Sequence, residues 1–108
     1  MTVVCIASAH TTMHAVLVSS SPAKDSAVSG PDFAIALQFN ERIDAHRSRV
    51  ALLLPDHRTQ PLTLTAGNAP GALESSAHAV PSGSCRIQWQ VLAADGHITR
   101  GEVPFTVR

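Results

Sequence analysis

Aromatic and sulfur-containing residues are scarce in this sequence. Its 108 residues include no tyrosine, one tryptophan, three phenylalanines, two cysteines and two methionines. Cys5 and Cys85 lack the paired spacing of a zinc ribbon or of a CxxC redox motif, so cysteine chemistry is not the leading theme. No set of nucleophile, base and orienting residue can be recognised either. We therefore do not expect an enzyme.

An excess of charge of either sign is also missing. Eight Lys and Arg residues balance eight Asp and Glu residues, so we expect no basic face for nucleic acid or for an acidic membrane surface. No apolar run approaches the ~20 residues that span a bilayer. A chain of this length makes one domain, which buries roughly 60 to 70% of its unfolded surface.

The first thirteen residues differ in composition and patterning from the rest of the sequence. A short apolar stretch, Val3 to Ala9, is followed by polar residues up to Met13. It looks like the end of an export signal, although the positive region at the start of such signals is missing. We expect a partial leader at 1–13 and a folded domain at 14–108. An ordinary N-terminal strand or a disordered tail is the alternative.

Apolar and polar residues alternate along most of the remaining chain, which is typical of half-buried strands. Turn residues rich in Gly, Pro, Ser and Asp separate the alternating segments, and no helical stripe is present. The pattern predicts an all-β fold, a Greek-key, immunoglobulin-like β-sandwich or barrel of about seven strands. Cys85 and Trp89 are expected in its core. The Thr65 to His78 stretch is expected to be a long connection. Strands are expected at 16–19, 33–39, 50–54, 62–64, 85–91 and 103–107.

Six histidines are many for a neutral domain of this size, and imidazole is the commonest metal ligand in proteins. Asp95-Gly96-His97 is the most specific candidate for a metal-binding motif in the sequence. The glycine allows a tight turn, so that a carboxylate and an imidazole two residues apart can face one point. A solvated surface turn is the other interpretation of this tripeptide.

His14 would become the first residue if the leader were removed just before it. An N-terminal histidine offers its α-amine and its ring Nδ1, which together can chelate one metal ion. Two such nitrogens with further N and O donors suit copper(II), which also tops the affinity order of divalent first-row metals.

Several segments resemble one known family. His14-Ala-Val-Leu-Val-Ser-Ser-Ser-Pro-Ala is similar to the mature start of CopC-like copper-resistance proteins, and Leu37-Gln-Phe-Asn-Glu follows as in that family. Pro81-Ser-Gly-Ser-Cys-Arg-Ile-Gln-Trp-Gln-Val resembles its PGxYxVxWxV strand. Ala94-Asp-Gly-His-Ile-Thr-Arg-Gly-Glu-Val-Pro-Phe-Thr-Val resembles its ADGHxxxGxxxFxV ending. The resemblance covers residues 14–108.

The resemblance implies a periplasmic protein that binds one copper(II) ion and serves copper homeostasis or resistance. It places the ligands at His14, through amine and imidazole, and at Asp95 and His97. Glu41 is either an outer partner of this site or a solvated carboxylate at a strand end. We expect a monomer whose partner is the copper ion, and an inner-membrane copper transporter is a further candidate partner.

The sequence departs from the family pattern in three places. No methionine follows Glu41, so a separate copper(I) site is not expected, and His46 and His57 are interpreted as surface residues. Cys85 replaces the usual tyrosine. Ile98 stands where many members have proline, which should loosen the loop and leave both ligands in place.

Two other functions remain open from the sequence. One is a copper oxidase with a His-brace of His14 and His97, which would need an open coordination position and a broad substrate face. The four aromatic residues can all be assigned to the core, which disfavours such a face. The other is a metal-free immunoglobulin-like interaction module. It predicts no copper binding and no effect of substituting Asp95 or His97.

Overall fold

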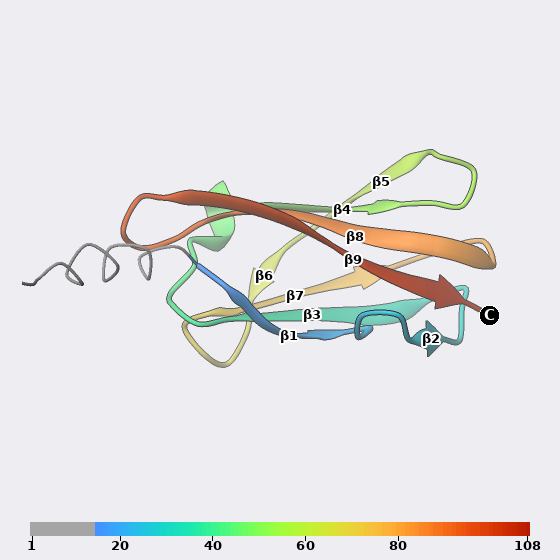
Figure 1. Cartoon of the computed structure of the whole chain (residues 1–108), viewed down its shortest axis with the longest axis horizontal. Helices are drawn as coiled ribbons and strands as arrows, with labels where there is room; N and C mark the ends of the chain where they lie inside the picture. The colour runs from blue at the N-terminus through green and yellow to red at the C-terminus, as the bar shows by residue number, and fades with distance from the viewer. Residues whose placement is uncertain (1–14) are drawn as a thin grey trace, which may run out of the picture.

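The computed structural model describes residues 15–108, which form two β-sheets packed face to face (Figure 1). This arrangement confirms the predicted all-β sandwich. The four-stranded sheet has the order β1 (Leu17–Ser21), β3 (Phe33–Phe39), β7 (Ala72–Ala77), β6 (Thr65–Ala66). The five-stranded sheet has the order β2 (Ala27–Val28), β9 (Ile98–Val107), β8 (Gly83–Leu92), β4 (Arg49–Leu53), β5 (Thr59–Leu62).

Neighbouring strands are antiparallel except for the short β2, which runs parallel to the end of β9. A short 3-10 helix, η2 (Ala45–Arg47), precedes β4, and Asp44 caps its start by accepting hydrogen bonds from two backbone N–H groups. Within residues 15–108, no helix has the length and hydropathy needed to cross a membrane.

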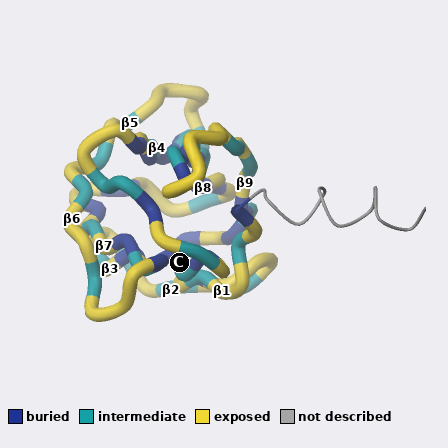
Figure 2. The backbone as a smooth tube through the Cα atoms, turned by 90° about the vertical axis from the view of Figure 1, so that its left-hand side faces the viewer, coloured by how far each residue is buried: buried dark blue, intermediate teal, exposed yellow. Residues whose placement is uncertain are grey.

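The core lies between the two sheets, where the buried faces of the alternating strands meet (Figure 2). The Phe39 ring from β3 packs edge-to-face on Trp89 from β8, with ring centroids 5.0 Å apart. Ile87 beside it is fully buried. The predicted position of Trp89 between the sheets is thus confirmed, and such aromatic pairs stabilise a core beyond the area they bury.

Cys85 also lies in the core, as the alternation predicts, with only 2% of its surface exposed. Burial raises the pKa of its thiol. The neutral thiol is therefore favoured, and this side chain acts as a small apolar core residue.

The expectation of a long connection from Thr65 to His78 is wrong. This stretch contains β6 and β7, and β7 pairs with β3 from Phe33↔Ala77 to Gln38↔Ala72. Leu73 and Ala77 are almost completely buried. The segment carries Ala, Ser and Glu, which are poor strand formers, so its strand character comes from pairing with β3 and from burial rather than from local propensity.

The last strand also begins earlier than predicted, at Ile98 instead of 103. Gly101 interrupts the alternation in sequence, yet it pairs with Trp89 in the ladder. A Cβ atom at Gly101 would overlap the indole ring. The glycine therefore makes room for the tryptophan.

Candidate metal centre

The turn between β8 and β9 is held closed by backbone hydrogen bonds. Leu92 and Ile98 form the last pair of the ladder. Beyond it the Ala93 N–H donates to the His97 carbonyl at 2.9 Å, and the Gly96 N–H donates to the Ala93 carbonyl at 2.9 Å. Gly96 has φ +89°, a backbone conformation that residues other than glycine rarely adopt. The sequence Asp-Gly-His therefore builds a fixed turn.

Within this turn the side chains of Asp95 and His97 lie together. One carboxylate oxygen of Asp95, Oδ1, accepts a hydrogen bond from the His97 backbone N–H at 3.0 Å. The other, Oδ2, lies 3.0 Å from Nδ1 of the His97 ring. The Asp95 side chain is 18% exposed and the His97 side chain 52%. The carboxylate thus orients the imidazole while the ring remains accessible from solvent.

This contact selects a tautomer of the ring. A carboxylate beside Nδ1 favours the proton on Nδ1 and the lone pair on Nε2. Carboxylate–imidazole pairs of this kind orient metal-binding histidines in many proteins. The geometry of Asp95 and His97 therefore suits metal binding.

The segment from Asn40 to Asp44 ties this turn to the start of the described chain. The Asn40 side chain accepts a hydrogen bond from the Val16 N–H at 2.8 Å, and the Asn40 N–H donates to the Val16 carbonyl at 3.0 Å. Two residues further on, the Arg42 carbonyl accepts from the Ala94 N–H at 3.0 Å. Figure 1 draws the start of the described chain and the β8–β9 turn at the same end of the sandwich.

Two of the three predicted metal ligands, Asp95 and His97, are thus brought together. The third, His14, lies outside the described residues and stays a prediction. Ala15, which follows it, is buried at 2% exposure in the core cluster. Among residues 15–108, no group of three or more His, Cys, Asp and Glu side chains is arranged to hold a metal ion.

The remaining predicted residues take different places. Glu41 lies half-buried in the segment that contacts the turn, and its role as an outer partner stays a prediction. His46 in η2 and His57 in the β4–β5 turn are exposed, as expected of surface residues. Sequence reasoning did not single out Asn40, whose only signal was its place next to Glu41 in the family-like segment.

The model of one protein family, the CopC domain, matches residues 17–108. The chain belongs to the CopC family. It is 32% identical over 104 residues to copper resistance protein C of Escherichia coli, an alignment that covers 88% of this chain and 82% of that protein. It is 31% identical to copper resistance protein C of Xanthomonas campestris pv. juglandis, over 100% of this chain and 91% of that protein.

Solved structures of CopC-family proteins share the fold. The crystal structure of CopC from Methylosinus trichosporium OB3b matches with a TM-score of 0.78 and 26% identity, covering 87% of this chain and 93% of that one. PcoC of Escherichia coli, described as a methionine-rich copper resistance protein, matches with a TM-score of 0.74 and 30% identity, covering 88% and 99%. The two-sheet architecture is therefore that of the family.

Proposed function

We propose that this protein binds a single copper(II) ion in the periplasm and sequesters or carries it, without catalysis. Membership of the CopC family, with relatives named copper resistance protein C, supports copper as the cargo. The observation that carries the proposal is the Asp95–His97 pair, oriented by the 3.0 Å contact between Oδ2 and Nδ1.

In this proposal the ion binds to His14, Asp95 and His97. His14 contributes its α-amine and ring nitrogen after removal of the leader at 1–13, Asp95 a carboxylate oxygen, and His97 a ring nitrogen. Nitrogen and oxygen donors in a tetragonal arrangement suit copper(II). The hydrogen bonds between Asn40 and Val16 support this ligand set, because they hold the chain two residues after His14 close to the segment that contacts the turn.

The types of donor atom support copper(II) as the proposed oxidation state. Both methionines, Met1 and Met13, precede His14, so the proposed mature chain holds no thioether. Soft thioether and thiolate ligands select copper(I), whereas imidazole, amine and carboxylate donors suit copper(II). An inner-membrane copper transporter is the partner we propose for a monomeric carrier of this kind.

Electron paramagnetic resonance tests the ligand set. The protein beginning at His14 is loaded with one equivalent of copper(II) and compared with a version that keeps one extra residue ahead of His14. We expect a tetragonal, nitrogen-rich signal that changes in the extended version, because the α-amine is then no longer available. A solvent-like copper signal in both proteins would contradict the proposal.

A further inference from the structure

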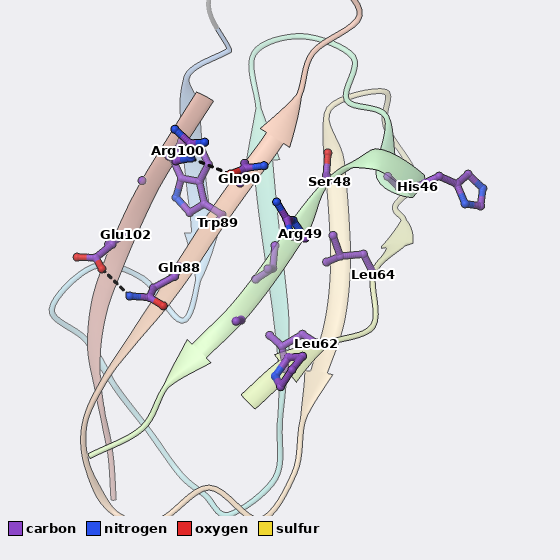
Figure 3. Close-up of a pocket in the computed structure, with 15 residues that line it drawn as sticks. His46, Ser48, Arg49, Leu62, Leu64, Gln88, Trp89, Gln90, Arg100 and Glu102 are labelled. Carbon is purple, nitrogen blue, oxygen red and sulfur yellow. Dashed lines mark hydrogen bonds between the residues drawn. The ribbon is translucent and has the colours of Figure 1, made fainter. Parts of the chain in front are cut away.

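The outer face of the five-stranded sheet points away from the core. There the twisted strands, η2 and the segment after β5 surround a hollow of about 750 Å³ (Figure 3). Volumes of ~300 to 1,000 Å³ are usual for sites that bind small molecules. Neither Asp95 nor His97 lines this hollow.

Three polar side chains form one row across its floor. Arg49 on β4 pairs with Gln90 on β8, and Gln90 pairs with Arg100 on β9. Adjacent strands are ~4.8 Å apart, so the two arginines sit about 10 Å from each other with the glutamine between them. Figure 3 shows the three side chains at the same level of neighbouring strands.

Most of the hydrogen-bonding groups in this row are donors. Arg100 donates from Nε to Oε1 of Gln90 at 2.7 Å, which occupies one lone pair of the glutamine oxygen and leaves its NH₂ group as a donor. Arg49 has no hydrogen bond or ion pair from its side chain to any other residue of 15–108. Two guanidinium groups and one amide NH₂ therefore face solvent together.

One carboxylate, that of Glu102, also lines the hollow, and its hydrogen-bond partners lie outside the row. Glu102 lies two register positions further along β9, opposite Gln88, and its oxygens accept from Arg86 at 2.9 Å and from Gln88 at 2.9 Å. These hydrogen bonds, from Gln88 and then from Arg86, lower the pKa of Glu102. Glu102 forms its ion pair with Arg86. Within residues 15–108 no carboxylate forms an ion pair with Arg49 or Arg100, so both guanidinium groups can interact with a ligand.

The opposite side of the hollow is apolar. Leu62 at the end of β5 and Leu64 just after it are half-buried against the core and line the hollow together with Pro61 and Ala51. In Figure 3 the two leucines lie beyond β4 from Arg100, and the His46 imidazole points away from the other lining residues. The small side chain of Ala51 leaves an open path from the donors to the leucines.

We propose that this hollow binds an amphipathic monocarboxylate, a carboxylate that carries an unbranched apolar chain. The carboxylate is held by Arg49, Gln90 and Arg100, because guanidinium groups recognise planar carboxylates through paired N–H donors. The apolar chain crosses Ala51 and covers Leu62 and Leu64. The site acts independently of the proposed copper centre.

Isothermal titration of the full, copper-free chain with octanoate tests this site. We expect one saturable site with a Kd of about 0.1 to 1 mM, a range reasonable for a ligand of this size. Titration with 1-octanol, which keeps the chain and loses the charge, and with acetate, which keeps the charge and loses the chain, should each bind at least about tenfold more weakly. Equal binding of octanol, or no saturation by octanoate, would overturn the proposal.

Substitutions then locate the site. Gln90→Glu places a carboxylate between the arginines and should abolish octanoate binding, and Arg49→Gln should weaken it about tenfold. Arg58→Gln removes the same charge from the β4–β5 turn, outside the hollow, and should leave the Kd unchanged. Thermal unfolding of each variant verifies the fold. If Arg58→Gln weakens binding as much as Arg49→Gln, overall charge explains the binding and the assigned site is wrong.

Discussion

Two aspartate–histidine pairs lie at opposite ends of the sandwich and differ in how they are built. Asp95 and His97 are two residues apart in one turn, with Nδ1 and Oδ2 3.0 Å apart. Asp32, before β3, and His78, after β7, come from distant segments, and their Nδ1 and Oδ1 atoms are 3.8 Å apart. The side chains of the second pair are 64% and 75% exposed.

The second pair belongs to a structural brace. Oδ1 of Asp32 accepts from the Ala79 N–H at 2.8 Å, and the Gln60 side chain bonds both the carbonyl and the N–H of His78. These contacts join the ends of β3 and β7 to β5. An aspartate beside a histidine is therefore not by itself a reason to propose a metal site. The first pair differs because the turn fixes both side chains and the start of the chain is tied to the same end.

Removing each histidine in turn tests whether the two pairs differ in copper binding. His97→Ala should weaken copper(II) binding at least about 100-fold, because it deletes a proposed ligand. His78→Ala should change it less than about threefold. Competition with a coloured chelator measures both. Equal losses in the two variants would show that the pairs are equivalent and would contradict the account.

The turn itself can be tested at Gly96. A valine there meets no atom within 4 Å of its Cβ, so its cost comes from the positive φ alone, about 1 to 3 kcal/mol of unfolding free energy. The displaced turn should weaken copper binding about tenfold. Gly96→Asn is the control, because asparagine tolerates positive φ better than valine does. Its stability and its copper affinity should lie between those of the unsubstituted protein and those of Gly96→Val. Urea unfolding and chelator competition give the two values, and copper affinity unchanged in Gly96→Val would show that the turn does not position the ligands.

A smaller effect is expected from the side chains that tie each end together. Asn40→Ala and Gln60→Ala each remove side-chain hydrogen bonds and should each cost about 1 kcal/mol in unfolding free energy. Only Asn40→Ala should also weaken copper binding, by about threefold to tenfold, because it frees the chain after His14. The same loss in Gln60→Ala would indicate that general destabilisation lowers the affinity.

Much of the fold could be predicted because it depends on local alternation. Phe39 and Trp89 each belong to a strand in which every second residue is apolar and faces the core. This pattern can be recognised from the sequence of each strand alone. The strand β7 was missed because its residues are small or polar and its strand character depends on pairing with β3. The early start of β9 was missed for a related reason. Gly101 interrupts the apolar alternation because only glycine leaves room for the Trp89 ring of the neighbouring strand.

The candidate site was predictable to the extent that it is local. Asp95 and His97 are two residues apart, so their convergence follows from one glycine turn. The contact of Asn40 with Val16 joins residues 24 apart, and the row of Arg49, Gln90 and Arg100 depends on the register of three strands. Such features emerge only when the sheets are assembled.

The most direct test of the proposed copper centre is X-ray diffraction at the copper absorption edge from crystals of the copper(II)-loaded protein beginning at His14. We predict one strong anomalous peak, within bonding distance of His97 and of the His14 amine. A peak beside His78, or no ordered copper at the β8–β9 turn, would contradict the account.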